Sequence, residues 1–291
     1  MSESPPYLVG LVGTGVTPSL TPPLHMAEAR ALGIDYVYRT IDLTALGLVP
    51  DQLPDILTWA RRLGFDALNI THPCKRLVIE YLDHVDPVAA ALGAVNTVLF
   101  TDDGLVGHNT DTTGFETALR TGLPDAALDR VVLLGAGGAG TAVGDALMRR
   151  GVRLLTVVDV DAHRAAEVAA DLGAHHGVDV CASRPADLPR LLADADGVVH
   201  CTPTGMHDHP GLPFSPALLR ADLWVADIVY RPLETELLHA ARAAGCRTLD
   251  GGRMAVFQAA DAFALITGIR PDADRMIDRF HRLVAADELV R

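Results

Sequence analysis

The chain has 291 residues, of which 49% are hydrophobic and 21% are charged. This composition indicates an ordered globular protein, and the length suggests two domains with a sizeable core. The 24 basic and 37 acidic residues give a formal net charge of −13, which argues against nucleic acid as a partner, because a surface that meets phosphates must be basic.

The cysteines and the apolar stretches of the sequence indicate where in the cell the protein is expected. Four scattered cysteines without a C-x-x-C pair indicate reduced thiols in a cytoplasmic protein; they are Cys74, Cys181, Cys201 and Cys246. The N-terminal segment MSESPPYLVGLVG lacks the basic region and long apolar run of a secretory signal. No stretch approaches an uncharged membrane span, so we expect no membrane partner.

The N-terminal part alternates apolar runs with helical patterns. Strands are predicted at residues 7–12, 34–43 and 65–71, and two extended segments are predicted within 95–111 around the turn Asp102-Asp103-Gly104. Helices are predicted from near Pro23 and at residues 51–64, 74–85, 86–94 and 114–124.

Several polar side chains in the loops of the N-terminal part can be interpreted either as structural or as functional. Ser19 and Thr21 precede a helix start, where hydroxyls can hydrogen-bond a carboxylate with help from the first amides. Local evidence alone favours Thr21 as a helix N-cap. Lys75 lies in the first turn of a predicted helix, where a cation is electrostatically misplaced. That misplacement is a mild sign of function, although a solvated surface lysine is the more common case.

The run VVLLGAGGAG at residues 131–140 organises the second half of the chain. Four apolar residues indicate a buried parallel strand. The following turn, Gly135, Ala136, Gly137, Gly138, Ala139 and Gly140, lets the backbone approach a pyrophosphate at a helix start. Asp159 closes the next apolar run, LLTVVD, where a carboxylate can accept from both ribose hydroxyls of a dinucleotide.

From Val131 onward, strands and helices alternate with short links, which predicts a parallel sheet with helices on both faces. One of these helices is predicted at residues 163–173 and ends at Gly173. Ligands of such sheets bind beyond the carboxyl ends of the strands, so Asp159, Thr202 and Val229 are expected near one dinucleotide. The predicted helices at 253–268 and 272–290 have no strand to follow and are expected to pack on the first domain. The domains are therefore predicted as 1–113 with 255–291, and 114–254.

Three other features are assigned no role. His207 and His209 flank Asp208 in a Pro/Gly loop, without a third ligand at a recognisable spacing. Cys74 beside Lys75 has no His/Asn relay, and packing explains it better. His175-His176 lies between a predicted helix and a strand and requires no function. We therefore expect no metal site.

Several motifs together resemble those of the shikimate dehydrogenase family, and more closely its quinate/shikimate dehydrogenase branch. They are S-L-T-P-P-L-H (19–25), N-I-T-H-P-C-K (69–75), G-A-V-N-T-V (93–98), G-H-N-T-D-T-T-G-F (107–115), the glycine turn (135–140), V-Y-R-P-L-E-T-E-L-L (229–238), and D-G-G-R-M (250–254) with Gln258. The resemblance covers essentially the whole chain. It implies an α/β fold with an N-terminal substrate domain and a Rossmann-type, doubly wound parallel-sheet domain for NAD.

The resemblance also implies roles for particular residues. Ser19 and Thr21 match the hydroxyl pair that holds a substrate carboxylate, and Lys75 and Asp111 match the catalytic pair at the reacting hydroxyl. The remaining matches contact either the substrate ring or the nicotinamide. Thr71, Asn96 and Gln258 match residues that hydrogen-bond ring hydroxyls, Tyr230 matches a tyrosine lining the substrate site, and Gly252 and Met254 match the segment near the nicotinamide.

The sequence departs from the common family pattern in places that bear on substrate and cofactor. Thr21 stands where a second serine is usual, and His72 also differs; both fit the quinate-accepting branch. The segment VVDVDAHR lacks the basic cluster of NADP-dependent members, and the carboxylate of Asp159 would repel a 2′-phosphate. We therefore predict NAD. Arg164 could contact the adenine ribose or the adenine ring, which leaves weaker NADP use open.

The implied reaction is hydride transfer between a small carboxylated cyclic polyol, quinate or shikimate, and the nicotinamide, with acid–base chemistry at Lys75 and Asp111. Two alternatives stay open: a dehydrogenase for an aminated analogue, and a dinucleotide-sensing protein without activity, against which the intact Lys75 and Asp111 argue. The sequence does not rank quinate against shikimate. The oligomeric state is also open, with a homodimer as one option.

Overall fold

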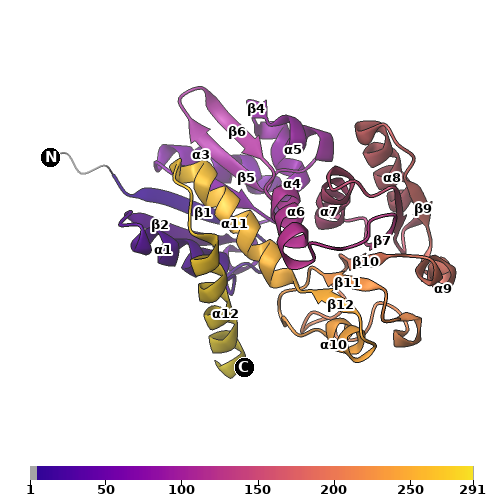
Figure 1. Cartoon of the computed structure of the whole chain (residues 1–291). Helices are drawn as coiled ribbons and strands as arrows, with labels where there is room; N and C mark the ends of the chain where they lie inside the picture. Colours follow the sequence, from indigo (N-terminus) through magenta and orange to yellow (C-terminus); the bar gives the residue numbers. More distant parts are fainter. Residues whose placement is uncertain (1–4, 291) are drawn as a thin grey trace. The chain divides into compact units, whose positions relative to one another are not determined.

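The computed structural model describes residues 5–290, and in the last helix the side chains up to residue 287. Residues 1–4, part of the segment in which no secretory signal is expected, and residue 291 lie outside the described residues. The chain divides into two compact units, Met1–Thr110 with Gln258–Arg291 (unit 1) and Asp111–Phe257 (unit 2) (Figure 1). The sequence-based boundaries lie three residues from these at each junction.

Unit 1 is built on a mixed six-stranded sheet in the order β2-β1-β3-β5-β6-β4. Its strands are β1 (Tyr7–Gly13), β2 (Tyr36–Asp42), β3 (Ala67–Ile70), β4 (His84–Val85), β5 (Thr97–Thr101) and β6 (Gly104–His108). β1 runs parallel to β2 and β3, whereas β5 is antiparallel to β3 and β6. The turn at Asp102-Asp103 joins β5 and β6 as predicted.

Helices cover both faces of this sheet. They are α1 (Thr21–Ala31), α2 (Leu43–Leu46), α3 (Leu53–Arg62), α4 (Cys74–Leu77), α5 (Pro87–Leu92), the later part of α11 (Gly251–Thr267), and α12 (Ala273–Val290). One apolar cluster joins α3, α4 and α5 to the sheet, and a second joins β1 and β2 to Met26 of α1 and Ile266 of α11. The C-terminal helices thus return to unit 1, as predicted.

Unit 2 contains a sheet in which all six strands are parallel, in the order β12-β11-β10-β7-β8-β9. The strands are β7 (Arg130–Leu134), β8 (Leu154–Val158), β9 (Cys181–Ser183), β10 (Gly197–His200), β11 (Trp224–Asp227) and β12 (Arg247–Leu249). From β7 the chain winds outward to β9, then crosses to β10 and winds outward the other way. The switch point of this doubly wound sheet therefore lies between β7 and β10.

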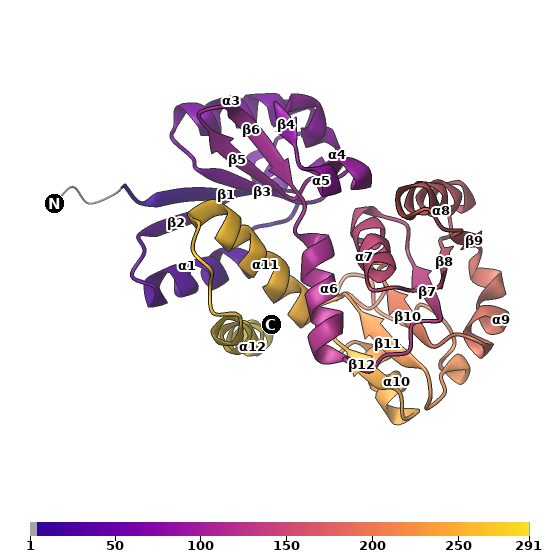
Figure 2. The ribbon, with the colours of Figure 1, turned by 45° about the horizontal axis from the view of Figure 1, so that its top comes forward.

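Helices cover both faces of the parallel sheet as well (Figure 2). They are α6 (Asp111–Gly122), α7 (Gly138–Arg149), α8 (Ala162–His176), α9 (Leu188–Ala193) and α10 (Glu236–Ala243). One core joins α6, α7 and α8 to side chains such as Leu133 and Val157, and another joins α9 and α10 to side chains such as Val132 and Val225. Burial on both faces explains the nearly uninterrupted apolar runs of these strands.

Two predicted elements are wrong in extent. The helix predicted at 74–85 is the single turn α4, followed by a 3₁₀ turn at Val78–Tyr81 and by β4. The backbone of Asp83 instead pairs with Leu105, whose amide also donates to the Asp83 carboxylate. The helix predicted to end at Gly173 continues through His176, and Gly177 terminates it with φ of 68°.

All four cysteines are free thiols. Among the described residues, no helix combines the length and the apolar character needed to cross a membrane.

Candidate active site

The glycine turn joins β7 to α7 with little room for side chains at its two ends. Gly135 has φ of 101° and donates its amide to the carbonyl of Val158 at 2.8 Å. A Cβ on Gly140 would overlap the carbonyl oxygen of Gly135. The first and last glycines therefore shape the turn and bring the helix close to the strand.

The middle of the turn is open. A Cβ on Gly137 or Gly138 would meet no heavy atom within 4 Å. α7 begins at Gly138, and its N-cap residue Gly137 offers no side-chain hydrogen bond to the first amides. Unpaired amides and the positive end of the helix dipole favour an anion. The residues present thus fit the pyrophosphate of a dinucleotide.

Asp159 is attached to the turn directly. Its Oδ2 accepts a hydrogen bond from the amide of Ala136 at 2.7 Å, and its Oδ1 accepts one from the amide of Asp161 at 2.9 Å. The half-buried carboxylate therefore links the glycine turn to the end of β8. Because each carboxylate oxygen can accept a second hydrogen bond, this anchoring leaves acceptor capacity for ribose hydroxyls.

Arg164 is paired within its own helix. Asp161 caps α8 by accepting from the amides of His163 and Arg164, at 3.1 and 3.2 Å, and Nη2 of Arg164 donates to Asp161 Oδ2 at 3.3 Å. These bonds, the one from the Arg164 amide above all, hold the pKa of Asp161 below its usual value. Arg164, the cation that the sequence analysis expected near the adenine ribose, is therefore already ion-paired with Asp161. The negative charges of Asp159 and Asp161 together outnumber its single positive charge.

A buried polar network joins the ends of β10 and β11. His200 Nδ1 lies 2.9 Å from Asp227 Oδ1, and His200 Nε2 lies 2.5 Å from the hydroxyl of Thr202. Asp227 also accepts from the amide of Val229 at 3.0 Å and from the hydroxyl of Thr235 at 2.8 Å. Both ring nitrogens of His200 therefore have a hydrogen-bonding partner within the network.

This network holds two residues that the sequence assigned to the cofactor, Thr202 and Val229. Our sequence analysis missed His200 and Asp227. The available signal was their position, since each is the polar last residue of an apolar strand.

The segment after β11 brings further predicted residues into unit 2. Tyr230 follows Val229 and is half-buried, and burial raises the pKa of its phenol. Gly252 lies in the first turn of α11, where its amide donates to the Asp250 carboxylate at 2.9 Å. Met254 is buried in the same helix, against the core that contains α6 and α7.

In unit 1, the loop before α1 is fixed by a carboxylate that the sequence did not single out. Asp42 accepts from the amides of Gly15 and Thr17, at 2.9 and 2.8 Å, and from the hydroxyl of Thr17 at 2.7 Å. The hydroxyl of Thr17 is the main cause that lowers the pKa of Asp42 to about 2. Asp42 also caps α2, so one buried anion orders the approach to Ser19.

The N-cap prediction for Thr21 is wrong. α1 begins at Thr21 itself, its N-cap residue is Leu20, and no side chain caps it. The hydroxyl of Ser19 accepts from the amide of Thr21 at 3.3 Å, which holds the Ser19 hydroxyl at the start of the helix that Thr21 begins. Since the Thr21 side chain is not used as a cap, the N-cap alternative to carboxylate binding falls away.

Thr71 and Lys75 follow the end of β3. The amide of Thr71 donates to the carbonyl of Val12 at 2.9 Å, and its carbonyl accepts from the amide of Cys74 at 2.8 Å. Cys74 is fully buried in the core, and burial raises the pKa of its thiol. Lys75, in α4, is half-buried, and its carbonyl accepts from the amide of Val95 at 2.9 Å, beside Asn96.

Asn96 fixes the backbone that leads into α6. Its Oδ1 accepts from the amide of Thr110 at 2.9 Å, and its Nδ2 donates to the hydroxyl of Thr110 at the same distance. The next residue, Asp111, is buried and begins α6, where a carboxylate is favoured by the helix dipole. Gln258, in α11, is half-buried.

The predicted residues thus form two sets, one in each unit. Unit 1 carries Ser19, Thr21, Thr71, Lys75, Asn96 and Gln258; unit 2 carries Asp111, the glycine turn, Asp159, Arg164, Thr202, Val229, Tyr230, Gly252 and Met254.

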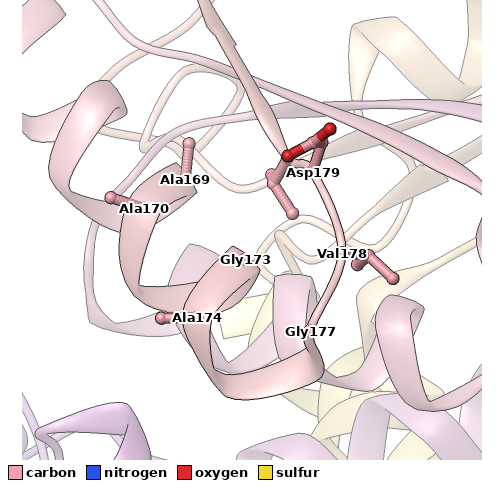
Figure 3. Close-up of a pocket in the computed structure, with 8 residues that line it drawn as sticks. Ala169, Ala170, Gly173, Ala174, Gly177, Val178 and Asp179 are labelled. Carbon is pink, nitrogen blue, oxygen red and sulfur yellow. The ribbon is translucent and has the colours of Figure 1, made fainter.

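A surface pocket of about 430 Å³ contains none of these residues. It lies between the later half of α8 and the segment before β9 (Figure 3), and is lined by Ala169, Ala170, Gly173, Ala174, Gly177, Val178, Asp179 and Val180. Its small side chains and single carboxylate offer no acid–base pair, so we assign it no catalytic role.

Two protein-family models match the chain. Residues 11–98 match the shikimate dehydrogenase substrate binding domain, and residues 118–207 match shikimate / quinate 5-dehydrogenase.

Relatives of this chain differ in the cofactor that their names specify. A shikimate dehydrogenase (NADP(+)) of Pseudarthrobacter chlorophenolicus is 58% identical, with 97% of each chain covered. A quinate/shikimate dehydrogenase (NAD(+)) of Corynebacterium efficiens is 48% identical, with 92% of this chain and 95% of the relative covered. The solved structure of quinate dehydrogenase from Corynebacterium glutamicum in complex with NAD is 48% identical, has a TM-score of 0.91, and covers 95% of this chain and 99% of its own.

Proposed function

This chain belongs to the shikimate dehydrogenase family, and on that premise we propose that it interconverts quinate or shikimate and the corresponding 3-dehydro acid, using NAD. As a member of this family it is an oxidoreductase that acts on an alcohol group with a nicotinamide dinucleotide. The observation that carries the cofactor part is the open face of Gly137 and Gly138 at the uncapped start of α7.

The residues of unit 1 support a carboxylated polyol as the substrate. The Ser19 hydroxyl is held at the start of α1 by the amide of Thr21, and the two hydroxyls with the helix amides could bind a carboxylate there. Thr71, Asn96 and Gln258 would then hydrogen-bond the ring hydroxyls. Such contacts orient the reacting carbon and hold it in place during the reaction.

Acid–base chemistry is assigned to Lys75. During oxidation its amine accepts the proton of the substrate hydroxyl, and during reduction its ammonium returns that proton to the carbonyl oxygen. Asp111 would accept a hydrogen bond from the same hydroxyl and orient it. A bound nicotinamide supplies the hydride acceptor or donor.

The charges around Asp159 support NAD over NADP, although a relative at 58% identity is named for NADP(+). A 2′-phosphate requires nearby cations. Here Arg164 is ion-paired with Asp161, and Asp159 adds a second carboxylate at the end of β8. Two carboxylates against one guanidinium disfavour a further anion.

We also propose a cytoplasmic location, because all four cysteines are free thiols.

The test of this function is kcat/KM for quinate, shikimate and their amino analogues, each with NAD and NADP, followed by the absorbance of the reduced nicotinamide. We expect turnover of quinate or shikimate, with NAD preferred. Turnover of the amino analogues alone would replace the substrate assignment. Binding of NAD without turnover of any of them would favour a sensing protein.

The assignment of Lys75 is tested by Lys75→Ala, with Arg76→Ala as the matched control, since Arg76 is the exposed neighbouring cation. Loss of an acid–base group lowers kcat by about 10²-fold or more, whereas the dissociation constant of NAD stays unchanged. Turnover by Lys75→Ala close to that of the control rules Lys75 out.

A further inference from the structure

Two histidines at the end of α8 contact a buried carboxylate of α7. The side chain of Asp145 is only 1% exposed. His176 Nε2 lies 2.8 Å from Asp145 Oδ1, and His175 Nε2 lies 3.8 Å from the same oxygen. One potential ligand atom from each residue lies within 4.8 Å of the other two. All three residues belong to unit 2.

Hydrogen bonding accounts for only part of this arrangement. Arg149 lies one turn along α7 and donates Nε to Asp145 Oδ2 at 2.7 Å, so it neutralises the carboxylate. The imidazole of His176 is close enough to hydrogen-bond Oδ1, and that of His175 is beyond hydrogen-bond distance. The two rings stand edge to face with centroids 4.7 Å apart. Two imidazole nitrogens and one carboxylate oxygen thus converge, which is a donor set used for zinc and related ions.

In contrast to the expectation from the sequence, which assigned His175-His176 no function and expected no metal site, we propose that Asp145, His175 and His176 bind one divalent transition-metal ion of the Zn²⁺ class and thereby link α7 to α8. With Zn²⁺ bonds of about 2.0–2.2 Å, tetrahedral ligand atoms lie roughly 3.4 Å apart. The two measured separations from Oδ1, 2.8 and 3.8 Å, lie on either side of that value. The third separation, between the two imidazole nitrogens, lies within 4.8 Å, so side-chain shifts of the order of an ångström complete the geometry.

The surroundings of the proposed metal site leave one coordination position of the ion open to water. The side chains of His175 and His176 are 39% and 16% exposed, so the ion is reached from solvent on their side while Asp145 closes the other. Arg149, bound to Oδ2, fixes the orientation of the carboxylate. Its positive charge also weakens attraction for a cation, so Arg149→Gln, which removes the charge but keeps an amide donor for Oδ2, should strengthen binding.

The expected consequence is stability of unit 2. An ion held by two helices binds the folded chain and not the unfolded one, so it raises the unfolding temperature. The site uses neither the glycine turn nor any residue assigned to the substrate, so loss of the ion is expected to leave kcat unchanged.

The test uses untagged, full-length protein that has been stripped with a chelator. Zn²⁺ is titrated calorimetrically, and Co²⁺ is followed by its visible absorption. The variants are the double substitution His175→Gln with His176→Gln, and the matched control His207→Gln with His209→Gln in an exposed His-Asp-His loop. Arg149→Gln completes the set.

We expect wild type and the control to bind one equivalent of Zn²⁺ and to unfold at a higher temperature with it. The double variant is expected to lose at least about tenfold in affinity and to show no Zn²⁺-dependent rise in unfolding temperature. Arg149→Gln should bind more tightly than wild type. The Co²⁺ complex should lack thiolate charge-transfer bands.

Equal Zn²⁺ affinity in the double variant and wild type overturns the proposal, as does loss of binding in the loop control or a thiolate band with Co²⁺. Circular dichroism and turnover without added metal verify that each variant is folded. If the double variant does not fold, the single substitution His175→Gln, at the more exposed of the two ligands, carries the same expected loss.

Discussion

Replacement of Asp159 separates its two roles, the anchoring of the glycine turn and the exclusion of a 2′-phosphate. Asp159→Asn removes the charge but keeps an amide oxygen that can accept from Ala136. Asp159→Ala removes both. Asp171→Asn, at an exposed carboxylate farther along α8, is the control for net charge.

The magnitude of the cofactor effect follows from the charges. Two unit charges about 4 Å apart interact by about 4 kcal/mol at an effective dielectric constant of 20. Because Asp159 is half-buried, we halve this for solvent and salt screening to about 2 kcal/mol, which corresponds to roughly 30-fold. Both variants should therefore raise the ratio of kcat/KM for NADP to that for NAD by about 30-fold.

The anchoring effect distinguishes the two variants. A hydrogen bond to a charged group contributes about 1.5–3 kcal/mol, and Asp159 accepts two from backbone amides, at 2.7 and 2.9 Å. Asp159→Ala loses both, so its kcat/KM for NAD should fall below that of Asp159→Asn.

The assay is initial velocity with each cofactor at a fixed substrate concentration. An unchanged NADP-to-NAD ratio in both variants, relative to Asp171→Asn, would refute the charge argument. Equal kcat/KM for NAD in the alanine and asparagine variants would refute the anchoring argument.

Three further predictions concern the turn, the buried network and a buried histidine. Gly140→Ala should lower the free energy of unfolding by about 1–3 kcal/mol, because its Cβ overlaps the Gly135 carbonyl. In Gly137→Ala the added Cβ meets no atom, so this variant should unfold like wild type but have a raised KM for the dinucleotide. Urea unfolding measures the stability of both variants, and steady-state kinetics measures KM. Equal unfolding curves for Gly140→Ala and Gly137→Ala would contradict the prediction. Asp227→Ala leaves three hydrogen-bonding groups without their partner, namely His200, the amide of Val229 and the hydroxyl of Thr235. It should lower the free energy of unfolding by about 3 kcal/mol or more in the same urea assay, and a loss below about 1 kcal/mol would contradict the network. Burial lowers the pKa of His25 in the folded protein to about 3, whereas a free histidine has a pKa of about 6.5. Between these two pH values only the unfolded chain binds a proton at His25. The free energy of unfolding therefore falls as the pH drops from about 6.5 toward 3. Between pH 7 and 5, wild type should lose about 2 kcal/mol more than His25→Phe, while His84→Gln, at an exposed histidine, should behave as wild type.

The local pattern of apolar residues and glycines in the sequence was sufficient to predict the parallel sheet and the glycine turn. In unit 2, each strand is a short apolar run covered on both faces, so its sequence differs clearly from the amphipathic helices between the strands. Gly135 and Gly140 lie in one continuous turn, and their spacing alone determines which glycine bends the chain and which approaches the strand.

Prediction from the local sequence pattern failed where hydrogen bonding to a distant strand or packing in the core decided where a helix ends. Residues 74–85 have helical character, but Asp83 exchanges hydrogen bonds with Leu105, and His84 pairs with Val106 in the sheet. Backbone pairing to β6 therefore ends the helix after one turn. Gly173 was expected to stop α8, but Leu172 is buried in the core and Gly177 supplies the left-handed terminus instead.

The sequence by itself determined the doubly wound domain, the family and the residue types of the candidate site, because those follow from periodicity and from motifs of adjacent residues. Only the tertiary structure revealed that Asp159 binds the glycine turn, that His200 and Asp227 support Thr202 and Val229, and that Asp145 meets His175 and His176. The contacts of Asp159 with Ala136, of His200 with Asp227 and of Asp145 with His176 join residues 23, 27 and 31 positions apart. The register of packed strands and helices sets which of their side chains meet, and local sequence does not encode that register.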